Sequence, residues 1–247
     1  MKKIFSLLLV LILFVSLCSC SGSDLASIKK DGVLLVGVTV YEPMDYRDTE
    51  GNWVGFDAEL AELAAKKLGV KVEFVIINWD EKTEKLKSKE IDCVWNGYTV
   101  NDSDKVSFSE PYAKNSPVLV VRNEKADEIK SIEDVEGLKI AYEKGSSSER
   151  IVKDIKSDFE KIPVSLQKEA LFSVQNGEAD ACVVDKTIYD SLVHTDLTSV
   201  YTFESENFAV GFRKGSDLVG EINSILEEIK KDGTLASLSA KYKVELT

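Results

Sequence analysis

The segment Gly145-Ser146-Ser147-Ser148-Glu149 carries groups that could hold an anion. It lies between a strand-like apolar run and a helical pattern, so its backbone N–H groups would lie unpaired at a helix start, where a carboxylate can bind. The same residues also fit an ordinary helix cap, in which a serine hydroxyl bonds to the backbone of its own helix. Taken alone, the segment supports both interpretations equally.

Motifs for catalysis are missing from the sequence. It has one histidine, His194, and no Gly-x-Ser-x-Gly, phosphate-loop lysine, Cys-x-x-Cys or His-Glu-x-x-His motif. His194 lies near the end of a polar helical pattern, which is typical of a helix terminus on the surface. The sequence therefore does not favour an enzyme, and we expect no cofactor and no bound metal.

Strand and helix patterns alternate along the chain. Asp57 can cap a helix that carries Leu60, Ala64 and Leu68 on one face and ends at Gly69. Apolar runs rich in β-branched residues predict buried strands at 33–40, 71–77, 91–95, 118–122, 139–142 and 181–184. Further helices are predicted at 81–88, 149–156, 167–176, 186–193, 217–231 and 234–241. This order predicts an α/β fold with mostly parallel sheets, and the extended stretches 116–121 and 203–208 are candidate crossings between domains.

The first twenty residues have the pattern of a leader. Lys2 and Lys3 precede an apolar run, Ile4 to Leu17, that is shorter than the roughly 18 residues of a spanning helix. The end of this run, Leu17-Cys18-Ser19-Cys20, resembles a bacterial lipoprotein signal, so we expect Cys20 to become a diacylated N-terminus that tethers the protein to a membrane. The alternative is an ordinary secretory peptide, cut near Ser21 or Gly22.

Composition narrows the class of protein. The 247 residues are 44% hydrophobic, which suits one large or two smaller folded domains. The formal charge is −12 and no basic cluster interrupts it, so nucleic acid is not an expected partner. Cys93 and Cys182 each lie in an apolar run, where two separate buried thiols are expected rather than one disulfide.

Beyond these features, the chain resembles the family of extracellular solute-binding proteins for polar amino acids that serve ABC transporters. The resemblance covers nearly the whole chain after the leader. It is carried by the order and spacing of Gly37 to Pro43, Gly51 to Ala61, Ile91-Asp92 with Asn96-Gly97-Tyr98-Thr99, Phe108 to Tyr112, Gly177 to Ala181 with Asp185, and Lys231 to Leu235.

The resemblance implies a two-lobed α/β protein of the periplasmic-binding-protein type II fold, with a ligand cleft between the lobes. Residues 1–20 would be the signal peptide, 21–116 the first part of lobe 1, 117–205 lobe 2, and 206–247 the return to lobe 1 with the C-terminal helices. Such lobes close on their ligand by a hinge motion.

The resemblance also implies roles for single residues. Tyr41 and Trp79 would form aromatic walls, Asp185 would pair with the ligand's ammonium group, and the turn Asn96 to Thr99 would contribute the Gly97 carbonyl and the Thr99 hydroxyl to it. Ser146 and Ser147 would bind the ligand's carboxylate. The alternatives are core aromatic residues, a helix N-cap at Asp185 and a plain strand-end turn.

One position departs from the family pattern. The cleft arginine that usually binds the ligand's carboxylate is replaced by Asp104, and Lys105 is the only cation in that loop. Lysine lacks the bidentate fork of arginine, so this substitution weakens orientation as well as attraction. The acidic residue that binders of basic amino acids carry shortly before Tyr41 is not evident either, which disfavours basic ligands.

The leading prediction is therefore a monomeric substrate-binding lipoprotein of an ABC importer. It would capture a polar or neutral amino acid, or a relative such as cystine, and deliver it to a permease. It would act on the outer face of the cytoplasmic membrane or in the periplasm. The alternatives are an enzyme offshoot of the same fold, resembling dehydratases, and a surface sensor or adhesin.

Overall fold

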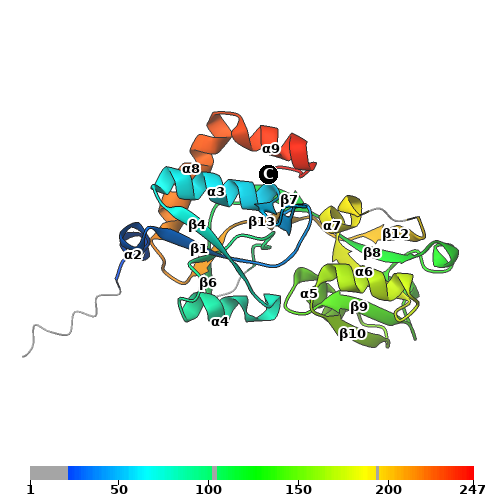
Figure 1. The fold of residues 1–247 in the computed structure, drawn as a ribbon. Coiled ribbons are helices and arrows are strands. Elements are labelled where there is room, and N and C mark those ends of the chain that lie inside the picture. Colours follow the sequence, from blue (N-terminus) through cyan, green and yellow to red (C-terminus); the bar gives the residue numbers. More distant parts are fainter. Residues whose placement is uncertain (1–21, 102–104, 193–194) are drawn as a thin grey trace, which may run out of the picture.

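The computed structural model describes residues 22–101, 105–192 and 195–247. The leader with Cys20, and the residues Asp104 and His194, lie outside these ranges. The described chain forms two lobes side by side, each built on one sheet with helices against it (Figure 1). The sequence-based prediction of a two-lobed α/β fold is confirmed.

The first lobe is built on a five-stranded sheet with the order β4-β1-β5-β14-β6. Strand β1 runs parallel to β4 and β5, whereas β14 runs antiparallel to β5 and β6. One face packs with α3, α8 and α9 in one hydrophobic cluster, and the other packs with α4 in a second cluster. Its elements are α2 (Asp24–Asp31), β1 (Val33–Val38), α3 (Phe56–Leu68), β4 (Lys71–Ile76), the short helix η1 (Trp79–Glu81), α4 (Lys82–Lys87), β5 (Cys93–Val94), β6 (Val106–Phe108), β14 (Gly211–Arg213), α8 (Leu218–Lys231) and α9 (Thr234–Tyr242).

The second lobe is built on a sheet with the order β10-β9-β11-β8-β12. Strand β9 is parallel to β10 and β11, and β8 is antiparallel to β11 and β12. Its elements are β8 (Pro117–Arg122), the short helices η2 (Asn123–Lys125) and η3 (Ile132–Asp134), β9 (Lys139–Glu143), α5 (Ser147–Asp154), β10 (Glu160–Val164), α6 (Gln167–Gln175), β11 (Ala181–Asp185), α7 (Lys186–Ser191) and β12 (Leu197–Thr202).

The chain crosses between the lobes at a pair of short antiparallel strands, β7 (Ala113–Asn115) and β13 (Glu206–Phe208). Strand β8 belongs to the second sheet, so most of the stretch 116–121 lies within a lobe and not in a crossing, in contrast to the expectation. Both sheets are mixed rather than mostly parallel, because β8 and β14 enter them from the crossing with opposite direction. The lobe boundaries at 116/117 and 205/206 remain a prediction.

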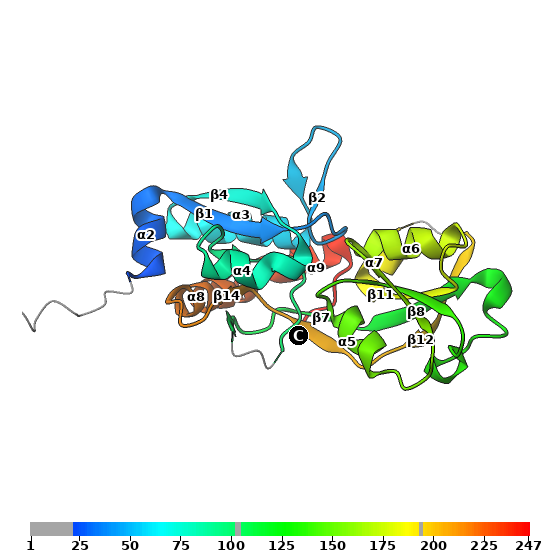
Figure 2. The ribbon, with the colours of Figure 1, turned by 90° about the horizontal axis from the view of Figure 1, so that it is seen from below.

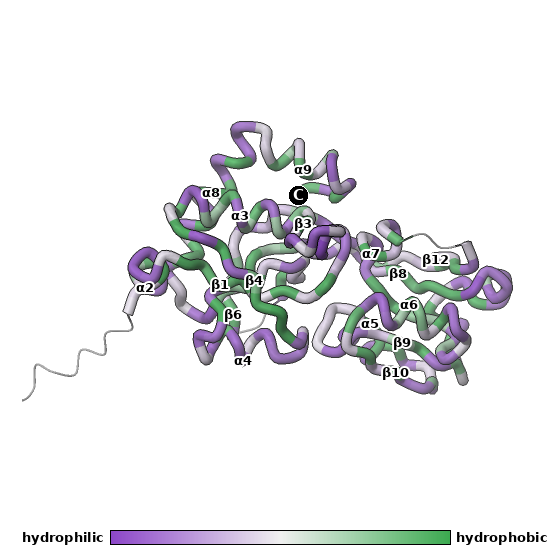
Figure 3. Tube along the Cα trace, viewed as in Figure 1, coloured by the Kyte–Doolittle hydropathy of each residue, from purple (hydrophilic) through white to green (hydrophobic). Residues whose placement is uncertain are grey.

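A hairpin of β2 (Tyr46–Arg47) and β3 (Trp53–Val54) projects from the first lobe (Figure 2). Hydrophobic residues follow the strands of both lobes, and hydrophilic residues follow the outer helices and loops (Figure 3). Within the described residues, no helix is long and apolar enough to cross a membrane, and no cluster of histidine, cysteine or carboxylate side chains could hold a metal ion. Cys93 and Cys182 are both buried free thiols, as expected.

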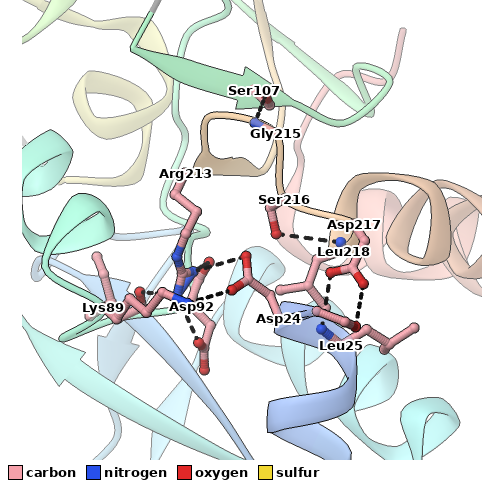
Figure 4. Close-up of polar contacts among 12 residues, drawn as sticks. Asp24, Leu25, Lys89, Asp92, Ser107, Arg213, Gly215, Ser216, Asp217 and Leu218 are labelled. Atoms are coloured by element: carbon pink, nitrogen blue, oxygen red, sulfur yellow. Dashed lines mark hydrogen bonds and ion pairs between the residues drawn. The ribbon is translucent and has the colours of Figure 1, made fainter. Parts of the chain in front are cut away.

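Polar contacts around Arg213 attach helix α2 to the first lobe (Figure 4). The Arg213 guanidinium lies 3.2 Å from the Asp92 carboxylate and 3.6 Å from that of Asp24, the first residue of α2. The Ser23 hydroxyl caps α2 by accepting a hydrogen bond from the Ala26 N–H, and it donates to the Asp217 carboxylate. The start of the described chain is therefore held tightly to the body of the lobe.

Candidate functional site

A small cavity of about 20 Å³ lies between the lobes. Its lining comes from the carboxyl ends of β1, β5, β9 and β11 and from the helix starts that follow in the second lobe, which is where open α/β sheets place their ligands. The lining residues are Thr39, Val40, Tyr41, Trp79, Asn96, Gly97, Thr99, Glu143, Ser146, Ser147, Gln167, Asp185 and Ile188. Eight of the nine predicted site residues are in this set, and Lys105 lines a neighbouring cavity instead.

Asp185 lies at the end of β11 and is buried where the lobes meet. Its carboxylate accepts hydrogen bonds from the Tyr41 hydroxyl across the cleft at 2.8 Å, from the Gln167 amide at 2.6 Å and from the Asn115 amide at 2.8 Å. All three donors are neutral. Burial raises the pKa of Asp185, and these hydrogen bonds oppose the rise only in part. A cationic group in the cleft would therefore be strongly attracted to Asp185.

The loop that follows β5 is fixed within the first lobe. The Asn96 amide accepts from the Thr39 N–H and hydroxyl and donates to the Thr39 carbonyl and the Asp45 carboxylate. Asn96 therefore supports the loop, and its contact with the ligand stays a prediction. Gly97 has φ +58°, and a Cβ there would come within 2.6 Å of the Tyr41 ring, so the close approach of this loop to Tyr41 requires glycine.

Two carboxyl groups are buried directly behind this loop. Asp57 accepts a 2.6 Å hydrogen bond from the Gly97 N–H, and Asp45 accepts one of 2.7 Å from Asn96. Among the described residues, one buried oxygen of the Asp45 carboxyl group has no hydrogen-bond partner. Burial raises the pKa of Asp57 to about 7, and burial together with the nearby Asp57 charge raises that of Asp45 well above its usual value.

Trp79 and Tyr41 are both buried walls of the cavity. The Trp79 ring contacts Tyr98 edge-on with the centroids 5.3 Å apart, and the Lys82 ammonium lies 4.4 Å from the centroid of Trp79. Tyr41 spans the cleft, because its hydroxyl contacts both Asp185 and Thr187 of the second lobe. Tyr41 thus joins the two lobes as well as lining the site.

The hydroxyl groups of Ser146 and Ser147 are both engaged. Ser146 is the N-cap of α5 and donates to the Glu143 carbonyl at 2.7 Å. Ser147 donates to the Glu206 carboxylate at 3.1 Å, and burial raises the pKa of Glu206 to about 7. The helix cap is therefore present, and the anion-binding alternative rests on the backbone N–H groups and on the surroundings of the segment.

Sequence reasoning missed Glu143 and Gln167. Glu143 ends β9 with 5% of its surface exposed, and burial and the nearby Asp185 raise its pKa well above the usual value. Gln167 begins α6 and makes two hydrogen bonds to Asp185. Its side-chain amide donates to the Asp185 carboxylate and accepts from the Asp185 N–H at 2.6 Å. The position of Glu143 at a strand end and that of Gln167 at a helix start are the sequence features that could have identified them as site residues. Glu143 gives the cleft a second carboxylate.

Comparison with known proteins agrees with this geometry. Residues 34–245 match the family model described as "Bacterial extracellular solute-binding proteins, family 3". The chain belongs to this family. One family relative is the L-cystine-binding protein TcyA of Bacillus subtilis, which is 33% identical over 98% of this chain and 97% of its own length.

Solved structures give the same result for the fold. The ancestral amino acid-binding protein AncCDT-1, a precursor of cyclohexadienyl dehydratase, is 35% identical with a TM-score of 0.83 and covers 89% of this chain and 99% of its own. An ancestral arginine-binding protein bound to arginine is 36% identical with a TM-score of 0.81 and covers 85% of this chain and 98% of its own. Family 3 members with this fold are mostly binding proteins.

Proposed function

We propose that this protein captures an amino acid outside the cell and delivers it to the permease of an ABC importer. The observation that carries the proposal is Asp185, a buried carboxylate between the lobes whose three hydrogen-bond donors are neutral. A zwitterion that leaves water needs a carboxylate for its ammonium group, because an unpaired buried charge is costly. Relatives named for binding cystine, arginine and histidine support this class of ligand.

The side chain of the ligand is less restricted than the sequence suggested. Basic ligands were disfavoured because no acidic residue shortly precedes Tyr41. Glu143, from the same lobe as Asp185, supplies a second buried carboxylate, and the nearby Asp185 charge helps to raise its pKa. We therefore include cationic amino acids among the candidates, beside cystine and other polar amino acids.

A thermal-shift screen of residues 21–247 against all amino acids and simple amines tests the proposal. At least one amino acid should raise the unfolding temperature, because a ligand that binds only the folded state stabilises it by mass action. Calorimetry would then give the affinity. If no amino acid binds, the proposal is wrong.

An enzyme is the second candidate, and the similarity to AncCDT-1, a precursor of a dehydratase, is the observation that favours it. We expect no turnover. Mass spectrometry of each bound ligand after long incubation with the protein would show its mass unchanged. Time-dependent loss of a ligand, absent in a boiled control, would establish an enzyme instead.

We also propose that Cys20 is diacylated and anchors the protein on the outer side of the membrane. The pattern Leu17-Cys18-Ser19-Cys20 supports this. In a bacterial host, the full chain should fractionate with membranes and the variant Cys20→Ala should not, while Cys18→Ala serves as the matched control. Mass spectrometry that finds an unmodified N-terminus at Ser21 or later would refute the anchor.

A further inference from the structure

A second cavity of about 320 Å³ lies beside the first and shares Trp79, Thr99, Ser146 and Ser147 with it. Its remaining lining differs in charge from that of the inner cavity. Lys82 and Lys105 line it from the first lobe, and Arg150 lines it from the second. The inner cavity is lined by the carboxylates Glu143 and Asp185, so cations predominate in the second cavity and carboxylates in the first.

Lys82 is the most unusual of these cations, because only 6% of its surface is exposed. Its ammonium donates to two neutral carbonyl groups, that of Trp79 at 3.0 Å and that of Gly145 in the opposite lobe at 2.8 Å. Among the described residues, no carboxylate forms an ion pair with it. Burial lowers the pKa of Lys82 to about 8, so the group is still mostly charged at neutral pH. The nearby charges of Glu143, Asp80 and Glu149 oppose this lowering, but the two hydrogen bonds of the ammonium go to carbonyls, which leaves its third N–H for an anion.

Arg150 lies in the first turn of α5, directly after the helix start that carries Ser146 and Ser147. It is 56% exposed, and its guanidinium is 3.9 Å from the Glu206 carboxylate, which is a loose pair. Glu149, which also lines this cavity, is already engaged by Lys153 at 3.0 Å and by the Gly145 N–H at 2.9 Å. The helix start adds its own partial positive charge on the same side.

We propose that Lys82 and Arg150 bind the carboxylate of the ligand, in place of the arginine that the family pattern expects at position 104. The ligand would then lie with its ammonium toward Asp185 and its carboxylate toward Lys82, Arg150 and the start of α5. This inference rests on the proposed function, since it assumes a ligand that carries both charges. It assigns the positive charge that binds the carboxylate to two helices, α4 and α5, whose sequences look ordinary and polar.

The test compares an amino acid with its carboxamide, which keeps the shape and removes the negative charge. Calorimetry on residues 21–247 would use L-cystine, L-arginine and L-histidine, each beside its amide, with the wild type, Lys82→Gln and Arg150→Gln. Lys85→Gln is the matched control, since Lys85 lies on the same helix and pairs with Glu90 at 2.6 Å. Thermal unfolding checks that each variant is folded.

The wild type should prefer the acid to the amide by about tenfold or more, the usual contribution of a hydrogen bond to a charged group. Lys82→Gln should remove most of this preference. It should lower the affinity for the acid and leave the affinity for the amide within about threefold of the wild-type value. Arg150→Gln should also reduce the preference for the acid, but by a smaller factor, because the Arg150 side chain is exposed and its charge is screened by solvent. Lys85→Gln should change the affinity for neither the acid nor the amide.

Different failures have different meanings. If Lys82→Gln weakens acid and amide equally, Lys82 acts only by joining the lobes through Gly145, and the inference is wrong. It is also wrong if both variants keep the full preference for the acid. If Lys82→Gln does not fold, Arg150→Gln alone still decides, because an exposed arginine can be replaced without loss of the fold. If none of the three binds the wild type, the comparison uses the tightest-binding amino acid of the thermal-shift screen and its amide. If no amino acid binds at all, the proposed function fails and this inference fails with it.

Discussion

At the scale of single residues, the cleft combines buried carboxyl groups with neutral hydrogen-bond donors. Burial raises the pKa of Asp185, Glu143 and Glu206, so each binds protons more readily than an exposed carboxyl group. A cationic ligand stabilises their ionised forms and releases these protons. Binding should therefore strengthen as pH rises through about 7, the pKa of Glu206.

Asp185→Asn should lower the affinity for the amino acid by about tenfold to a hundredfold, because the ligand's ammonium loses its charged partner. The fold should persist, since the asparagine side chain has the same shape and carries no buried charge. Calorimetry on Asp185→Asn, with Asp190→Asn as an exposed control on α7, measures the effect. A loss of less than about threefold would contradict the role of Asp185.

The resemblance to a family predicted the residues that follow strand ends, and the structure brings Tyr41, Trp79, Thr99 and Asp185 together around one cavity. It could not predict Lys82. The helix Lys82–Lys87 is rich in lysine and looks solvent-exposed in sequence, and Lys82 becomes buried only because Trp79 and the opposite lobe cover it. Burial that depends on contact between distant segments leaves no local pattern.

At the scale of elements, helix positions agreed with their sequence patterns to within a few residues, as for α6 at Gln167–Gln175. Strands were less predictable. The apolar run 91–95 forms only the short strand Cys93–Val94, because its neighbours β1 and β14 pair with it over two residues each. The direction of β8 was missed, since direction depends on the route of the chain and not on composition, and β14 was not predicted as a strand.

Arg213→Met should destabilise the first lobe by about 1.5–3 kcal/mol, because it removes the guanidinium from the half-buried Asp92 and leaves the buried Asp24 paired with Lys89. Urea unfolding would measure the loss, with Lys214→Met as the exposed neighbouring control. Hydrogen exchange should also increase in α2, which these contacts attach to the sheet. A loss no larger than that of the control would show that the cluster contributes little.

At the scale of the whole molecule, buried carboxyl groups make stability depend on pH. The folded-state pKa of Asp57 is about 7, and those of Asp45, Asp185, Glu143 and Glu206 are also raised, chiefly by burial. The folded state therefore holds protons that the unfolded state releases above about pH 4. Stability should be highest in mild acid and fall as pH rises toward about 7.

We expect the free energy of unfolding without ligand to fall by at least about 3 kcal/mol between about pH 5 and pH 8, since each unit of pKa shift corresponds to about 1.4 kcal/mol. Denaturant titrations across this range measure it. Asp45→Asn should flatten the curve, because it removes one titrating group of the buried pair. A stability that rises over the same range would contradict this assignment.

The two buried cysteines provide a natural kinetic label for each half of the molecule. Cys93 lies in the first sheet and Cys182 in the second, and neither exposes any surface. In residues 21–247, an excess of thiol reagent can modify each sulfur only while its own sheet is open. Peptide masses over time would give two separate opening rates without any mutation. Equal rates would identify one cooperative unit, and unequal rates would reveal a half-folded species in which one lobe survives alone.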